Sequence, residues 1–262
     1  MNDIGFGIMC FGDDYYYRGA TEKIREFRKY GFKSYVLTDN EDKFDDLLAF
    51  NKFEIDYLYY YRSFKSYYDK MILVKEILKY HDICILIDAD THITDYSFLN
   101  DLKTYEFKEG ISYPDVVLNH SEKKQFVSEI DMSAREWKYF HDRAKNMLSD
   151  FQNLELIWEY FMVFNQKGLN QKEFYLNYEK LQIAKEFGDL SYNKKVNGSG
   201  GVNAAGEGIA IAIASKLSQT SCQRDLDLYD DIKNKMSSIS KNFTRPEFWP
   251  DWMKDDNKSG VH

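Results

Sequence analysis

The chain has 262 residues, with 35 Lys and Arg against 43 Asp and Glu, which gives a formal net charge of −8. Aromatic residues make up 17% of it, and this excludes an intrinsically disordered chain, because disorder requires few aromatic and apolar residues. The acidic balance gives no general support for nucleic-acid binding. No apolar run approaches the roughly 20 residues of a membrane span, so we expect no transmembrane segment.

Three cysteines, Cys10, Cys84 and Cys222, are widely spaced along the chain. An odd number at such spacing does not suggest a disulfide framework. The pattern is typical of buried thiols in a reducing compartment. We therefore expect a cytoplasmic protein, and the Lys-, Asn- and Tyr-rich composition would fit a bacterial or phage-infected cytoplasm.

Strand and helix signals alternate over the first 120 residues. Strands are expected at residues 4–11, 33–38, 53–60 and 83–87, and helices at residues 19–30 and 69–80. The run at 83–87 is apolar throughout, as in a central strand of a parallel sheet that is covered on both faces. Alternation of this kind predicts an α/β fold.

The second half of the chain is less regular. Helices are expected at residues 133–150, 169–187 and 207–217, and residues 154–164 form an apolar segment that fits either a strand or a helix. Residues 193–206 are rich in Gly, Asn and Ser, which predicts a flexible loop.

Asp88-Ala89-Asp90 directly follows the apolar run at 83–87. Ligands of open α/β sheets bind outside the carboxyl ends of the strands. Two carboxylates held close together need a cation, and Mg²⁺ or Mn²⁺ prefers such oxygen ligands and keeps phosphate oxygens in its shell. The triplet therefore predicts a metal site that would bind a diphosphate. The alternative is a pair of acids that merely cap a turn.

A second cluster, from Asp13 to Ala20, follows the first strand and opens a helix. The start of a helix after a strand is a ready anion site, and a tyrosine there can present its ring face to a nucleobase. Tyrosine is abundant in this chain, with 21 in all, so the alternative is that these rings pack against the edge of the sheet.

Residues 8–20, 35–38 and 70–93 resemble the GT-A-fold glycosyltransferases, and most closely the glycogenin-like retaining enzymes. The resemblance implies a single GT-A-like (Rossmann-like) domain over residues 1–262, with a mixed central sheet flanked by helices. Residues 1–120 would form the half that binds a nucleotide-sugar, and residues 121–262 the half that binds the acceptor.

The resemblance also implies roles for individual residues. Asp88 and Asp90 match the family's metal-binding pair, and Tyr16 matches its base-stacking tyrosine. The donor-binding candidates are Tyr16, Arg18, Lys70, Cys10, Asp13 and Glu159.

Three assignments in the second half rest on weaker matches. Glu207 would face the reacting sugar, where a carboxylate can stabilise an oxocarbenium-like transition state or act as a nucleophile. It could instead be an ordinary first-turn acid that favours the helix dipole. Glu159 is a sugar-contact candidate or a plain surface residue, and His262 is a candidate third metal ligand at the end of the chain.

The sequence thus predicts a metal-dependent hexosyl- or pentosyltransferase. The resemblance alone implies that the enzyme retains the anomeric configuration. Its donor would be a nucleoside-diphosphate sugar, with a UDP-sugar expected, and its cofactor Mn²⁺ or Mg²⁺. A glycan is the favoured acceptor, with a protein or a modified DNA base as alternatives. Two other functions remain open: a nucleotidyltransferase, and an inactive nucleotide-sugar-binding protein of the same fold.

Overall fold

The computed structural model describes residues 2–12, 14–38, 40–44, 55–59, 69–114, 135–155, 157, 159–181, 200–232 and 234–238. Contacts divide the chain into two compact units, each made from separate stretches of sequence. The first unit comprises residues 1–61, 73–106 and 230–262, and the second comprises residues 62–72 and 107–229.

The strands described for the first unit include a parallel set, hydrogen-bonded in the order β3, β2, β1, β4. These strands are β1 (Ile4–Cys10), β2 (Lys33–Thr38), β3 (Ile55–Tyr59) and β4 (Ile83–Ile87). The strands β2 and β4 have the bounds predicted from the sequence, and β1 and β3 fall within the predicted ranges. Because the strands are parallel, their carboxyl ends meet at the same edge of the sheet.

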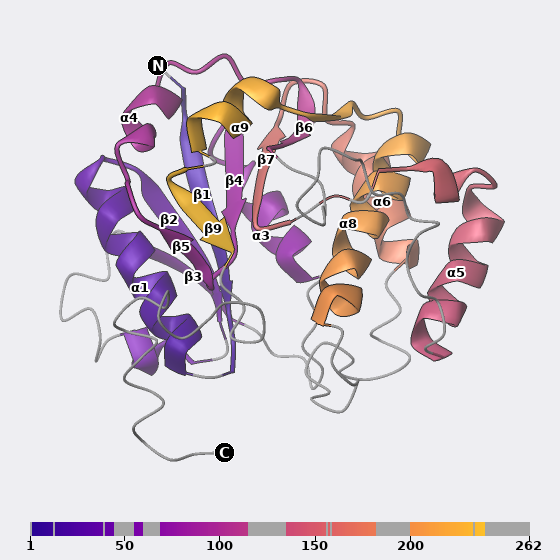
Figure 1. Ribbon diagram of the computed structural model, residues 1–262, viewed down its shortest axis with the longest axis horizontal. Helices are drawn as coiled ribbons and strands as arrows, with labels where there is room; N and C mark the ends of the chain where they lie inside the picture. Colours follow the sequence, from indigo (N-terminus) through magenta and orange to yellow (C-terminus); the bar gives the residue numbers. More distant parts are fainter. Residues whose placement is uncertain are drawn as a thin grey trace. The chain divides into compact units, whose positions relative to one another are not determined.

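Helices and a small second sheet complete the described part of this unit (Figure 1). They are α1 (Asp14–Lys29), α4 (Phe98–Leu102), the later part of α3 (Lys70–Ile77), and the antiparallel strands β5 (Thr91–Ile93) and β9 (Met236–Ser238). The strands β5 and β9 pair although they lie far apart in the sequence, so the end of the described chain returns to the first unit.

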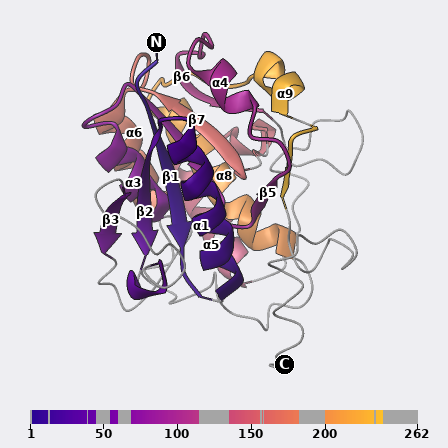
Figure 2. The ribbon, with the colours of Figure 1, turned by 90° about the vertical axis from the view of Figure 1, so that its left-hand side faces the viewer.

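The central strand β1 is covered on both faces. Successive side chains of a strand point to opposite faces, and Phe6 stacks on Phe27 of α1 with ring centroids 4.1 Å apart. Figure 2 shows α1 lying across this face of the strands. On the other face are Gly5 and Gly7, where an added Cβ on Gly5 would lie 2.6 Å from Cγ2 of Ile77 in α3. The glycines thus let α3 approach the sheet closely.

The second unit contains both parallel and antiparallel strand pairs. Its described strands are β6 (Gly110–Tyr113), β7 (Phe161–Asn165) and β8 (Cys222–Arg224). The strand β6 pairs with β7 in antiparallel and with β8 in parallel. The helices are α5 (Arg135–Met147), the 3₁₀ helix η4 (Phe151–Asn153), α6 (Gln171–Leu181), α8 (Gly200–Leu217) and α9 (Leu226–Ile232). The last residues of α9, from Asp230, belong to the first unit. The chain therefore has the predicted α/β fold, with parallel and antiparallel strands flanked by helices.

Two helices begin earlier than the sequence predicted. Helix α1 starts at Asp14 rather than Gly19, and an acid in the first turn favours such a start. Helix α8 starts at Gly200 rather than Glu207, so residues 200–206 are helical instead of forming a flexible loop. Most helical stability in proteins comes from packing rather than intrinsic propensity, and the later part of α8 is deeply buried. The rest of the predicted loop, residues 193–199, lies outside the described residues.

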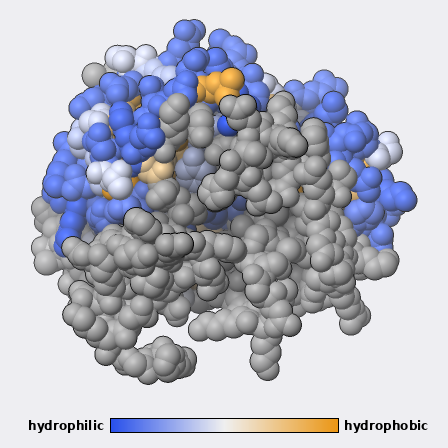
Figure 3. Space-filling model, in the orientation of Figure 1, coloured by the Kyte–Doolittle hydropathy of each residue, from blue (hydrophilic) through white to orange (hydrophobic). Residues whose placement is uncertain are grey.

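The surface drawn in Figure 3 is largely hydrophilic where residues are described. Tyr80, Leu176 and Leu226 are the large apolar side chains found exposed among those residues, and each comes from a different part of the chain. None of the helices in the described ranges is long and apolar enough to cross a membrane.

Candidate functional site

The predicted metal-binding pair lies on a tight turn at the carboxyl end of β4. The backbone N–H of Thr91 donates to the carbonyl oxygen of Asp88 at 3.1 Å and closes this turn. Ala89 is buried, whereas Asp88 and Asp90 are partly exposed. All five residues of β4 are buried, so the strand fixes where the turn begins. The two carboxylates thus stand at the sheet edge where ligands of α/β proteins bind.

A buried lysine that the sequence analysis did not single out contacts this turn. Lys23 of α1 is only 2% exposed. Its Nζ donates to the carbonyl oxygens of Ala89 at 2.8 Å and Gly19 at 3.1 Å. Burial lowers the pKa of Lys23 to about 8, although nearby negative charges, that of Glu22 first and those of Asp90 and Asp88 after it, act to raise it. A positive charge therefore lies close to the two carboxylates.

The tyrosines at the start of α1 differ in exposure. Tyr15 and Tyr17 are buried, while Tyr16 is partly exposed and its ring centroid lies 3.9 Å from that of Tyr15. Arg18 is also partly exposed. Of the three rings, Tyr16 is thus the one with a surface to offer a ligand.

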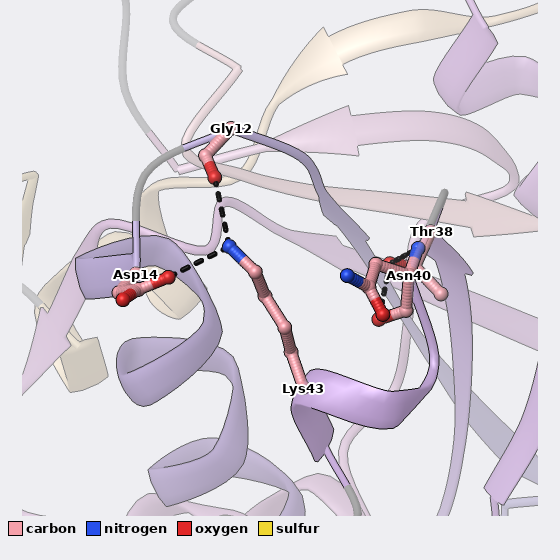
Figure 4. Close-up of polar contacts among 5 residues, drawn as sticks. All are labelled: Gly12, Asp14, Thr38, Asn40 and Lys43. Carbon is pink, nitrogen blue, oxygen red and sulfur yellow. Dashed lines mark hydrogen bonds and ion pairs between the residues drawn. The ribbon is translucent and has the colours of Figure 1, made fainter.

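Lys43 ties the loop after β1 to the segment after β2 (Figure 4). Its Nζ lies 2.7 Å from Oδ1 of Asp14 and donates to the carbonyl oxygen of Gly12 at 3.5 Å. The hydrogen bond from Lys43 holds the pKa of the Asp14 carboxyl below its usual value. The same Nζ lies 4.5 Å from the ring centroid of Tyr17. Lys43 therefore connects two loops at the carboxyl edge of the sheet, and the sequence analysis did not single it out.

In the second unit, the structure brings together two acids and a lysine that were predicted separately. Nζ of Lys70 lies 3.0 Å from Oε2 of Glu207, with the two side chains 9% and 2% exposed. Glu207 lies about two turns inside α8. The interpretation of Glu207 as a first-turn acid is therefore wrong, because the helix begins well before it.

Glu159 is bound to the backbone next to Glu207. It is 4% exposed, and its Oε1 accepts a hydrogen bond from the N–H of Gly208 at 2.5 Å. A Cβ on Gly208 would clash with the carbonyl oxygen of Ile157. The close approach of α8 to Ile157 therefore requires glycine at position 208. The burial of Glu159 excludes the interpretation of a plain surface residue.

The last three predicted site residues are Cys10, Asp13 and His262. Cys10 is fully buried at the end of β1, and burial raises the pKa of its thiol well above 9.0. Asp13 and His262 lie outside the described residues.

The two carboxylates at the turn after β4 offer oxygen atoms, which are the ligands that hard divalent cations prefer. Within the ranges that the structure describes, no group of three or more His, Cys, Asp or Glu side chains is arranged to hold a metal ion. The protein ligands of a cation at this turn would thus be the two carboxylates of Asp88 and Asp90. Mg²⁺ is commonly bound through one or two carboxylates, with water and substrate phosphates completing its shell. Such a cation would arrive with, or be retained by, a phosphorylated ligand.

No protein-family model matches the chain, and no curated protein matches it significantly. Among solved structures, an active-site mutant of LgtC aligns with 98% of this chain and 95% of its own, with a TM-score of 0.52 and 11% identity. The galactosyltransferase LgtC in complex with donor and acceptor sugar analogs aligns with 68% of this chain and 63% of its own, with a TM-score of 0.43 and 11% identity. The glycosyltransferase GlyE of Streptococcus pneumoniae TIGR4 aligns with 88% and 47%, with a TM-score of 0.42 and 11% identity.

The alignment over nearly the whole of both chains shows that this chain shares the fold of the LgtC mutant. The predicted GT-A-like glycosyltransferase fold is thus confirmed. Fold alone does not determine function, so the activity has to be argued from the residues of the site.

Proposed function

We propose that the chain is a metal-dependent glycosyltransferase that moves a sugar from a nucleoside-diphosphate sugar to an acceptor, with retention of configuration. The observation that carries the proposal is the Asp88-Ala89-Asp90 turn at the carboxyl end of the buried strand β4. A fold shared with a solved glycosyltransferase supports it.

The residues of the first unit would bind the nucleoside diphosphate. Asp88 and Asp90 would hold Mn²⁺ or Mg²⁺ against the diphosphate, and the bound cation would stabilise negative charge on the leaving group. Tyr16, which is partly exposed, would stack on the base, for which uracil is the expected identity. Arg18 would donate to phosphate oxygens, which guanidinium groups bind with good geometry.

Three further residues, Glu207, Lys70 and Glu159, would act on the sugar. Glu207 would face the transferred sugar and stabilise positive charge that develops on it, or form a covalent bond to it. Lys70 lies 3.0 Å from Glu207 and would hold the carboxylate in place. A lysine ammonium has three N–H donors, so Lys70 can pair with Glu207 and also donate to the donor substrate. Glu159 would fix the backbone beside Glu207 through its bond to Gly208.

The acceptor is proposed to be a neutral glycan. The net charge of −8 disfavours a polyanionic acceptor such as DNA, because phosphate backbones are bound chiefly through clusters of Lys and Arg. A cytoplasmic location would give the enzyme access to nucleotide-sugars.

The test is hydrolysis of a panel of nucleotide-sugars in the absence of acceptor, with and without Mn²⁺. We expect slow, Mn²⁺-dependent turnover of one donor. Asp90→Asn should reduce that turnover at least about 100-fold, because it removes one of two charged ligands at the proposed metal site. Asp101→Asn, which changes an exposed acid on α4, should leave it unchanged.

Each other outcome points to a different function. Binding of a donor without turnover, even when glycan acceptors are supplied, would indicate an inactive binding protein. Release of pyrophosphate from a nucleoside triphosphate and a sugar phosphate would indicate a nucleotidyltransferase. If calorimetry shows no binding of any donor with Mn²⁺ present, the proposal is wrong.

A further inference from the structure

A charged side chain interrupts the apolar face of α1. Ala20, Ile24 and Phe27 are buried on this helix, and Lys23 is buried with them at 2% exposure. Lys29, in the last turn of the same helix, shows the ordinary arrangement, since its side chain is 66% exposed. A lysine is almost never fully buried unless its charge is paired or hydrogen-bonded, so the position of Lys23 needs an explanation.

The partners of the Lys23 ammonium explain how it can be buried. Two backbone carbonyl oxygens accept its hydrogen bonds, that of Gly19 within α1 and that of Ala89, which is 66 residues away in sequence. Asp88 and Asp90 lie close enough for their negative charge to act on it. An apolar side chain of similar length would fill the same space. It could not donate to the Ala89 carbonyl, however, and this is the bond that joins α1 to the turn.

The contact falls at the middle of the turn. Ala89 is flanked by the two predicted metal ligands, and the bond from Thr91 to the carbonyl oxygen of Asp88 closes the turn around it. The peptide that follows Ala89 leads directly into Asp90. A donor that fixes the Ala89 carbonyl therefore restricts the backbone of both acids, while the positive charge offsets part of the repulsion between their carboxylates.

We infer that Lys23 is a positioning residue, which holds the Asp88–Thr91 turn in its ligand-binding shape before a divalent cation arrives. The role in cation binding rests on the proposed function, whereas the role in ordering the turn does not. Helix α1 also carries Tyr16 and Arg18 near its start. Through Lys23, the helix proposed to bind the nucleotide is tied to the acids proposed to bind the metal.

The test is amide hydrogen exchange at Thr91, measured by NMR in metal-free protein. In wild type the bond to Asp88 should protect this amide. Lys23→Met keeps the length and apolar stem of the side chain but removes its hydrogen bond to the turn. A buried carbonyl without its donor costs enough to raise local opening roughly ten- to 100-fold. Exchange at Ile85, in the centre of β4, should be unchanged. Equal protection of Thr91 in both proteins would overturn the inference.

Two further variants separate this effect from general damage to α1. Thr21→Val changes another buried side chain of α1, whose hydroxyl bonds only within the helix, to Tyr17 at 2.7 Å. It should leave the Thr91 amide protected. Lys23→Gln keeps an N–H donor on a shorter, neutral side chain and provides a test if the methionine variant does not fold. It should raise exchange at Thr91 by a smaller factor, and no rise in the folded protein would again overturn the inference.

Addition of Mg²⁺ separates this inference from the proposed function. In wild type, Mg²⁺ should slow Thr91 exchange further, because a cation that binds only the ordered turn opposes its opening. In Lys23→Met, Mg²⁺ should restore protection for the same reason, but at a higher concentration, because the turn is less often in its ligand-binding shape. A purely structural lysine would not give this difference. Loss of protection that Mg²⁺ does not restore would support the role of Lys23 in ordering the turn and would contradict its role in cation binding.

Discussion

The Lys70–Glu207 pair is almost entirely removed from water, with side chains 9% and 2% exposed. Moving a single charge into a protein interior costs several kcal/mol, and an oppositely charged partner at close range offsets much of that cost. Each residue therefore lowers the cost of burying the other. A carboxylate held in this way can remain inside the protein, shielded from water.

This dependence predicts the effect of removing the lysine alone. Lys70→Met should lower the free energy of unfolding by about 3–5 kcal/mol, because it leaves the Glu207 carboxylate buried without its ammonium partner. Adding Glu207→Leu to this variant should restore most of the loss, since an apolar pair of similar volume is often as stable as a buried ion pair. Urea denaturation of the three proteins measures both effects.

The chain contains a matched control for this experiment. Lys79 and Glu76 form an ion pair at 2.6 Å, but their side chains are 51% and 29% exposed. Lys79→Met should cost less than about 0.5 kcal/mol, because water screens such surface pairs. If Lys70→Met and Lys79→Met cost the same, burial does not determine the strength of the pair.

Residues of the candidate site could be predicted from the sequence only where their position follows from the residues next to them in the chain. Asp88 and Asp90 were identifiable because they end an apolar strand. Lys23 and Lys43 were not, because their partners lie 66 residues away at Ala89 and 29 residues away at Asp14. The one local signal for Lys23 was its place on the same helical face as buried apolar residues.

At the scale of elements, the packing of α3 on β1 depends on residues without side chains. A Cβ on Gly5 would lie 2.6 Å from Cγ2 of Ile77 and 2.7 Å from Cδ2 of His81. His81 cannot move freely, because it contacts the Tyr35 hydroxyl at 2.9 Å and Asp3 Oδ1 at 2.6 Å. The helix therefore has to shift if the glycine is replaced.

Gly5→Ala should accordingly destabilise the protein by about 1–3 kcal/mol, the usual cost of forcing an extra methyl group into a packed core. The double variant with Ile77→Ala should cost less than the sum of the two single changes, because the smaller side chain makes room for the new methyl group. Thermal or urea unfolding measures the four proteins of this cycle. Strictly additive costs would show that the two positions do not compete for space.

The boundaries of elements were predictable where residue chemistry changes sharply. The strand β4 matches its prediction because charged or turn-forming residues flank an uninterrupted apolar run. The start of α8 was missed because Gly200 and Gly206 indicate a loop by local propensity, whereas burial of the following apolar residues keeps the segment helical. Residues 154–164 were ambiguous for a related reason, since a short apolar run has no periodicity that separates a buried strand from a buried helix.

At the scale of the whole molecule, thiols with raised pKa values couple stability to alkaline pH in both compact units. Cys10, Cys84 and Cys222 are free cysteines, of which the first two are buried and Cys222 is partly exposed. Burial raises the pKa of Cys10 and Cys84 well above the ordinary 9.0, and raises that of Cys222 to about 12. The unfolded chain therefore loses these protons near pH 9, while the folded protein still holds them.

When the folded state binds more protons than the unfolded state, stability falls as pH rises. We expect the free energy of unfolding to be independent of these thiols below about pH 8 and to decline above pH 9, in the presence of a reductant. Cys84→Ala should make this decline shallower, by up to about 1.4 kcal/mol per pH unit. Ile85→Val, at a fully buried neighbour in β4, should lower stability equally at every pH. Urea unfolding between pH 7 and 10.5 measures these slopes, and parallel curves for Cys84→Ala and wild type would show that the thiol at position 84 does not contribute.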